Sequence, residues 1–165
     1  MHVLKAVGFL FLICLTSRTC DLVYARAGGT TMAAQPQLQF SLTLDRSVYT
    51  ANLAPPIDPP QMTARLTLRN NTSQPVVLTF GSGQRYDLEL KNERGEVVYR
   101  WSDGMMFTML FGQERFGPGE TNYTIVHKLA GQDGKPLPTG KYVAEGWITC
   151  TEEGPYRATA GFEIR

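Results

Sequence analysis

The chain has 165 residues, with 16 Lys and Arg against 15 Asp and Glu, so its formal net charge at pH 7 is +1. This balance lacks the basic excess that nucleic acids and anionic membranes attract, and it argues against both as partners. Residues 37–165 are close to the usual size of one domain, about 100–150 residues, so we expect a single domain there.

The first 27 residues have the pattern of a secretory signal peptide. Lys5 precedes an apolar run over residues 6–15, and small residues allow cleavage after Ala25 or Ala27. The apolar run is shorter than the ~20 residues that span a bilayer, which argues against a retained membrane anchor. After cleavage, no membrane span is expected. We therefore expect a secreted or extracytoplasmic protein.

The short polar stretch over residues 28–36 is expected to be a flexible linker. Removal of the signal peptide leaves Cys150 as the one cysteine, so an intramolecular disulfide cannot form. The stability of residues 37–165 must then come from their apolar core.

Apolar and polar residues alternate with a period of two along most of this domain, which is typical of half-buried β-strands. The strands expected from this alternation and from the turns between them are residues 38–44, 62–68, 76–80, 86–90, 97–101, 122–128, 141–150 and 156–165. The same alternation predicts a shared interior, because a slip by one residue would turn each apolar set toward water. The residues expected to face it are Leu42, Leu66, Leu88, Tyr142 and Phe162.

Many short strands joined by Gly-, Pro- and Asn-containing turns favour an all-β fold, an antiparallel immunoglobulin-like β-sandwich. Tyr142, which follows Gly140 just ahead of a strand, is similar to a tyrosine corner, whose hydroxyl bonds back to the preceding chain. Residues 50–61 contain two Pro-Pro pairs and are expected to form an extended connection outside the central sheet.

The segment after the fifth expected strand combines turn chemistry with large apolar side chains. Asp and Gly favour a tight turn, whereas Met adapts to irregular partner surfaces, and a contiguous apolar loop is a candidate contact site. The alternative is that Met106, Phe107, Leu110 and Phe111 plug one end of the sandwich. The residues expected to form the contact site are Trp101, Ser102, Asp103, Gly104, Met105, Met106 and Phe107.

The sequence offers little support for catalysis or for a cofactor. His127 is the one histidine left after export, and its place on an expected strand favours a structural role. A thiol pair of Cys150 with His127 stays open as an alternative, although no nucleophile turn lies nearby. We expect no enzyme activity, no metal site and no nucleotide cofactor, since metal-ligand clusters and Gly-rich phosphate loops are lacking.

Several motifs together resemble the BsuPI family of intracellular proteinase inhibitors, over about residues 37–150. They are Gly83-Gln84-Arg85-Tyr86-Asp87, Trp101-Ser102-Asp103-Gly104-Met105-Met106-Phe107, Pro118-Gly119-Glu120 and Pro138-Thr139-Gly140-Lys141-Tyr142. The resemblance implies inhibition of a subtilisin-type serine protease, and the export signal sets this chain apart from an intracellular inhibitor.

Met105, Met106 and Phe107 have the side chains that hydrophobic protease pockets accept. Gln84, Arg85 and Tyr86 are expected to support the loop, with Arg85 donating to a carboxylate such as Asp103 or to carbonyls. The opposing interpretation makes Arg85 and Asp87 solvated charges at a strand edge. The alternative function is a non-inhibitory immunoglobulin-like module that binds another protein of the cell envelope or surface.

Overall fold

The structure is a computed structural model that describes residues 37–51 and 58–165, and the expected signal peptide and linker lie outside these ranges. No helix long and apolar enough to cross a membrane occurs within the described ranges. Their strands are β1 (Leu38–Leu44), β2 (Val48–Tyr49), β3 (Gln61–Asn70), β4 (Val76–Phe80), β5 (Tyr86–Asn92), β6 (Val97–Arg100), β7 (Gly112–Phe116), β8 (Gly119–Lys128), β9 (Gly140–Ile148) and β10 (Arg157–Ile164).

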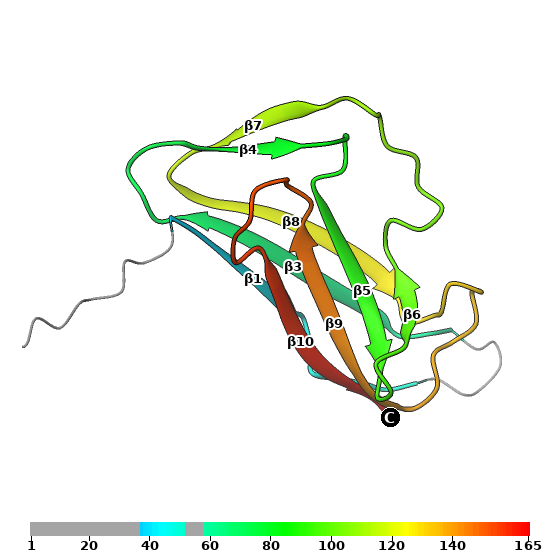
Figure 1. The fold of residues 1–165 in the computed structure, drawn as a ribbon. Coiled ribbons are helices and arrows are strands. Elements are labelled where there is room, and N and C mark those ends of the chain that lie inside the picture. Colours follow the sequence, from blue (N-terminus) through cyan, green and yellow to red (C-terminus); the bar gives the residue numbers. More distant parts are fainter. Residues whose placement is uncertain (1–36, 52–57) are drawn as a thin grey trace, which may run out of the picture. The chain divides into compact units, whose positions relative to one another are not determined.

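The strands form two larger sheets and a ribbon (Figure 1). One sheet has the order β1-β3-β8, the other has the order β2-β10-β9-β5-β6, and β4 pairs with β7 alone. All pairs are antiparallel except the two-residue pair of β2 with β10. The expectation of an all-β sandwich is confirmed, whereas its immunoglobulin-like topology stays a prediction.

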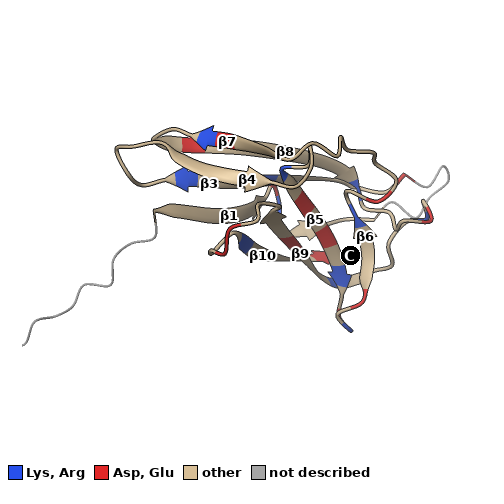
Figure 2. Ribbon diagram, turned by 45° about the horizontal axis from the view of Figure 1, so that its top comes forward, with Lys and Arg blue, Asp and Glu red and all other residues tan. Residues whose placement is uncertain are grey.

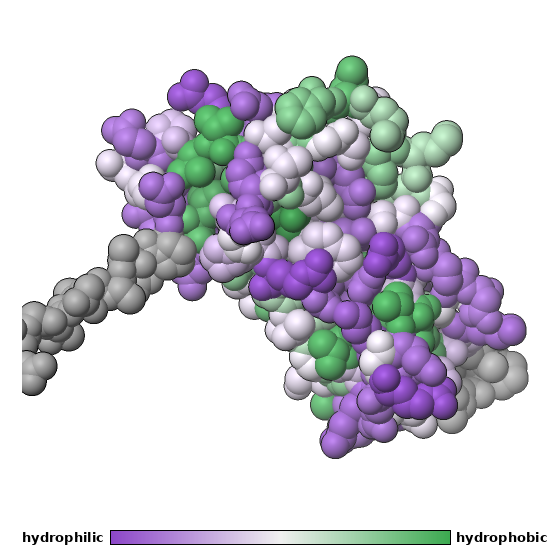
Figure 3. All heavy atoms as spheres, in the orientation of Figure 1, coloured by the Kyte–Doolittle hydropathy of each residue, from purple (hydrophilic) through white to green (hydrophobic). Residues whose placement is uncertain are grey.

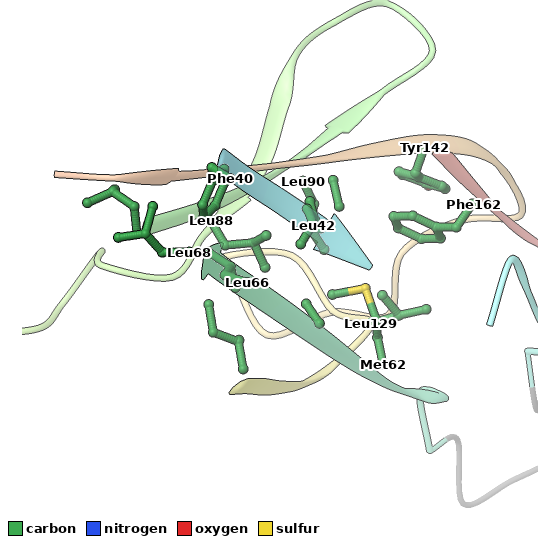
Figure 4. Packing of buried hydrophobic residues seen from close by; sticks show 14 of the residues in the cluster. Phe40, Leu42, Met62, Leu66, Leu68, Leu88, Leu90, Leu129, Tyr142 and Phe162 are labelled. Atoms are coloured by element: carbon green, nitrogen blue, oxygen red, sulfur yellow. The ribbon is translucent and has the colours of Figure 1, made fainter. Parts of the chain in front are cut away.

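The sandwich core contains all five residues expected to face the interior. Leu66 and Leu88 are completely buried, and Leu42, Tyr142 and Phe162 are at most 7% exposed. Figure 4 shows these side chains converging from β1, β3, β5, β9 and β10. A Cβ atom at Gly146 of β9 would lie 3.1 Å from Leu66 Cδ2 of β3, so the two sheets approach closely at this glycine.

Tyr142 lies at the start of β9 and closes one end of the core. Its hydroxyl donates to the Pro138 carbonyl at 2.8 Å, which confirms the bond back to the chain expected from the sequence. Its ring stacks on Phe162 of β10 at 5.4 Å between centroids. The residue therefore fixes the segment before β9 while it fills the interior.

The outer face of the five-stranded sheet carries a network of alternating charges (Figure 2). Glu89 is 5% exposed and pairs with both Arg100 and Lys91. Lys91 also pairs with Glu145, which accepts from Arg157 at 2.6 Å. The charges of this face are thus largely neutralised by one another, and the largest exposed apolar side chains lie elsewhere.

Candidate protein-binding loop

The connection from β6 to β7 exposes the largest apolar side chains of the described residues. Residues 101–104 form a turn, and residues 105–111, here called the apolar loop, have no regular secondary structure. Met106 is 99% exposed, and the other strongly exposed side chains are Met109 at 88%, Phe111 at 72% and Leu110 at 71%. Figure 3 shows apolar atoms gathered where this connection runs. The alternative in which these side chains plug the sandwich is therefore wrong for Met106, Leu110 and Phe111.

A buried carboxylate holds the turn that precedes the apolar loop. Asp87 of β5 is 4% exposed, and its Oδ2 accepts from the Ser102 hydroxyl at 2.7 Å. Its Oδ1 accepts from the backbone N–H groups of Ser102 at 3.2 Å and Leu88 at 2.9 Å. Asp87 is thus neither solvated nor merely a strand-edge charge. It ties the turn after β6 to β5, the neighbouring strand of the same sheet.

The backbone of the turn has the conformation that its sequence favours. Gly104 has a φ angle of +80°, the left-handed region that glycine adopts without a steric penalty. The Met105 N–H donates to the Ser102 carbonyl at 3.0 Å and completes the turn. Asp103 is exposed at its tip. The apolar loop therefore starts from a defined geometry.

A stack of aromatic rings supports the start of the apolar loop. Trp101 lies on Tyr86 with ring centroids 4.6 Å apart, and Tyr86 lies on Tyr123 at the same distance. Phe107 is half-buried, and its ring centroid is 6.0 Å from that of Trp101. Burial raises the pKa of the Tyr86 hydroxyl, which stays protonated at neutral pH. Tyr86 and Phe107 thus join the apolar loop to the sandwich through Trp101.

The segment before β5 provides a second support. The Gly83 N–H donates to the Thr108 carbonyl in the middle of the apolar loop at 2.8 Å. A Cβ atom at Gly83 would lie 2.5 Å from Thr108 Oγ1, so the close approach depends on glycine. Gln84 donates from its side-chain amide to the Tyr86 carbonyl at 3.1 Å, and its own carbonyl accepts from Thr149 at 2.8 Å. Gln84 therefore fixes the segment that carries Gly83.

Arg85 forms a third support, with a partner that sequence reasoning missed. Its Nε donates to the Glu114 carboxylate at 2.5 Å, and Nη1 donates to the Ser82 carbonyl at 2.8 Å. Its guanidinium carbon also lies 4.5 Å from the centroid of the Phe80 ring. The carboxylate that Arg85 contacts is thus Glu114 of β7, not Asp103. The pair links the segment before β5 to the strand that follows the apolar loop.

The two residues considered for catalysis, His127 and Cys150, lie in surroundings that favour a structural role. The His127 ring stacks on Tyr99 with centroids 3.6 Å apart, and its Nε2 lies 3.0 Å from the Ala130 carbonyl oxygen. Burial lowers the pKa of His127, so the ring is neutral at pH 7. Burial, with a smaller contribution from Glu152, raises the pKa of the Cys150 thiol, which disfavours the nucleophilic thiolate. Within residues 37–51 and 58–165, no group of three or more His, Cys, Asp or Glu side chains could hold a metal ion.

The described residues thus combine a β-sandwich with an anchored loop of exposed apolar side chains. The family model BsuPI, described as intracellular proteinase inhibitor, matches residues 42–153, which is more than half of the chain. The chain therefore belongs to the BsuPI family of intracellular proteinase inhibitors, and this is a family of inhibitors rather than enzymes. No curated protein matches the chain.

Solved structures resemble the fold only distantly. The DNA glycosylase AlkC of Pseudomonas fluorescens is 12% identical with a TM-score of 0.45, and the match covers 78% of this chain and 30% of that one. The sporulation control protein Spo0M of Bacillus subtilis is 11% identical with a TM-score of 0.41, and the match covers 79% of this chain and 49% of that one. A β-glucosidase of Erythrobacter marinus is 10% identical with a TM-score of 0.43, and the match covers 78% of this chain and 15% of that one. The chain thus spans less than half the length of each, and likenesses at this level carry no functional argument.

Proposed function

We propose that this protein is an extracytoplasmic inhibitor of subtilisin-type serine proteases, and that the apolar loop is the part that enters the protease. Membership in a proteinase inhibitor family supports the general activity. The observation that carries the loop assignment is the exposure of Met106, Met109, Leu110 and Phe111, which is between 71% and 99%. Side chains this exposed in a contiguous segment are available to a partner.

The supports of the loop suit an inhibitor because they limit the entropy lost on binding. Binding is weakened by the ordering of flexible segments, and pre-ordering reduces that loss. The turn is held by Asp87, the middle by Gly83 and the far side by the pair of Arg85 with Glu114. Apart from Thr108, the side chains of the apolar loop are Met, Leu and Phe, which match hydrophobic protease pockets.

The test is inhibition of a subtilisin-type protease by the protein as its cell makes it, measured beside the free energy of unfolding. Met106→Ala removes a 99% exposed side chain and should leave the free energy of unfolding within about 0.5 kcal/mol. If Met106 is a binding hot spot, inhibition should weaken about 30-fold, which corresponds to about 2 kcal/mol. The matched control is Val97→Ala, which truncates a 49% exposed side chain at the far end of β6 and should change neither quantity.

Two results would redirect the assignment. If Met106→Ala lowers the free energy of unfolding in proportion to the inhibition it loses, the loop packs on the sandwich and another surface binds the protease. If the wild-type protein inhibits no serine protease, the non-inhibitory protein-binding module becomes the better interpretation.

The extracytoplasmic location is supported by the signal-peptide pattern of residues 1–27. Mass spectrometry of protein from the envelope or medium should give an amino terminus at Arg26 or Gly28. It should also find Cys150 as a free thiol. An intact amino terminus on cytoplasmic protein would place the target inside the cell, in line with the description of the family.

A further inference from the structure

Half of the methionines in the chain lie in the apolar loop. The sequence has six, and Met105, Met106 and Met109 fall within five consecutive positions. Their exposed fractions are 45%, 99% and 88%, whereas Met62 of β3 is completely buried between the sheets. The chain therefore contains both highly accessible thioethers and an inaccessible one.

Exposed thioethers are chemically distinct from the other apolar groups of the loop because they can be oxidised reversibly. A sulfur lone pair attacks the terminal OH oxygen of a hydroperoxide, the O–O bond breaks and an S–O bond forms, and the proton of that OH group passes to the departing oxygen. Sulfur loses two electrons, and the hydroperoxide is reduced to an alcohol, or to water when the oxidant is hydrogen peroxide. Methionine sulfoxide reductases reverse this change.

We propose that the apolar loop is a methionine-oxidation site, at which hydroperoxides convert Met106 and Met109 to sulfoxides and thereby weaken the loop's binding to its partner. The sulfoxide is polar, whereas the thioether is apolar and adaptable. A sulfoxide placed in a hydrophobic pocket would lose its hydration without gaining a hydrogen bond. The effect on inhibition rests on the proposed function, and the oxidation itself does not.

The position of the methionines predicts that oxidation leaves the fold intact. Met106 and Met109 are 99% and 88% exposed, so their sulfoxides remain in water in the free protein. Met62 contributes to the core, where oxidation would disrupt packing, but its burial keeps hydroperoxides away from the sulfur. Oxidation is thus directed to the apolar loop, the proposed binding surface, and away from the core residues that stabilise the fold.

The first experiment maps oxidation on the folded protein. Brief treatment of the full chain with hydrogen peroxide, followed by peptide mass spectrometry, should oxidise Met106 and Met109 at least about tenfold faster than Met62. The same treatment in denaturant should abolish the difference, because unfolding exposes Met62. Equal rates for the three residues in the folded protein would overturn the proposal.

The second experiment uses a variant that keeps the apolar loop apolar but cannot form sulfoxides there. M105L/M106L/M109L retains Met32, Met62 and Cys150, so any oxidation at those positions is common to both proteins. After peroxide treatment, the wild type should elute earlier from a hydrophobic-interaction column, and the variant should elute unchanged. Unchanged retention of the oxidised wild type would overturn the proposal.

Inhibition is then measured on the same samples with a subtilisin-type protease. Oxidation should weaken inhibition by the wild type about tenfold or more and leave the variant unaffected, and treatment with methionine sulfoxide reductases should restore the wild type. Equal losses in both proteins would show that oxidation elsewhere is responsible. If the untreated wild type does not inhibit, the proposed function fails, while peptide mapping and column retention still decide whether the loop is an oxidation site.

Discussion

Asp87 provides the sharpest test of how the sandwich holds the turn that precedes the apolar loop. Its carboxylate is 4% exposed and accepts from the Ser102 hydroxyl, the Ser102 N–H and the Leu88 N–H. Asp87→Ala removes all three bonds and leaves donors unsatisfied in a site that water reaches poorly. The turn over residues 101–104 should then lose its fixed position.

The expected loss of stability follows from the number and kind of these bonds. Hydrogen bonds to charged groups are each worth about 1.5–3 kcal/mol, but water entering the truncated site offsets part of the loss. We expect the free energy of unfolding to fall by about 3 kcal/mol, which lowers the melting temperature by about 10 °C for a domain of this size.

Asp87→Asn is the matched control because it keeps the shape of the side chain. The amide oxygen can accept from the Leu88 and Ser102 N–H groups, while the amide nitrogen can donate to the Ser102 hydroxyl oxygen. Among the described residues Asp87 has no ion-pair partner, so loss of its charge breaks no salt bridge. We expect a loss of about 1 kcal/mol or less.

Urea denaturation and protease inhibition should be measured for both variants. If the loop inhibits, Asp87→Ala should weaken inhibition even at temperatures where the variant is fully folded, whereas Asp87→Asn should inhibit nearly as well as the wild type. The reasoning is refuted if Asp87→Asn is as destabilising as Asp87→Ala, because the charge and not the hydrogen-bond geometry would then be responsible.

Three further substitutions test other supports of the fold. Tyr142→Phe removes the bond to the Pro138 carbonyl and should lower the free energy of unfolding by about 1 kcal/mol in urea denaturation; no loss would show that this bond is dispensable. Glu114→Gln breaks a partly exposed ion pair with Arg85 and should lower it by only about 0.5–1 kcal/mol, less at high salt; a salt-independent loss would contradict the electrostatic account. Because burial lowers the pKa of His127 below its ordinary 6.5, the unfolded chain binds its proton first as pH falls, so stability should decrease below about pH 6.5. His127→Gln should flatten that slope between about pH 5 and 6.5 in denaturation series, and an unchanged slope would assign it to other groups.

Sequence reasoning succeeded where a short-range pattern determines the structure. Alternation with a period of two predicted eight strands and the burial of Leu42, Leu66, Leu88, Tyr142 and Phe162, because each strand of a sandwich has one face toward the core. The turn at Gly104 was predicted for a similar reason, since its φ angle of +80° is a local preference of glycine.

The strand β7 was missed because it lacks such a pattern. Its sequence, Gly-Gln-Glu-Arg-Phe, contains one buried residue, Phe116, and its regularity comes from pairing with β4. A two-residue strand such as β2 is too short to show a period at all. These elements depend on partners that are distant in the sequence.

The sequence predicted the supports of the loop only in part, because their contacts join residues that are distant in the sequence. Alternation places Asp87 on the outer face of β5, which suggested a solvated charge, but the turn after β6 folds over that face and buries the carboxylate. The partner of Arg85 is Glu114, 29 positions away on the strand that could not be predicted. The motif identified Arg85 as a candidate support but did not identify Asp87, and only the tertiary structure shows what each side chain binds.

The exposure of the apolar side chains in the loop argues for a partner more strongly than the loop's composition does. Single exposed valines on strands, such as Val48 at 38% and Val97 at 49%, are ordinary in a folded domain. Met106, Met109, Leu110 and Phe111 are 71–99% exposed within six positions, and a contiguous apolar surface of this kind is uncommon without a function. Complete burial of such a side chain contributes about 1.5–3 kcal/mol, against about 0.5–1.5 kcal/mol for ordering it at an interface. Because the sandwich already holds the turn and the middle of the loop, little further entropy is lost in ordering the loop backbone, and the difference between these two terms favours binding when another surface covers the loop.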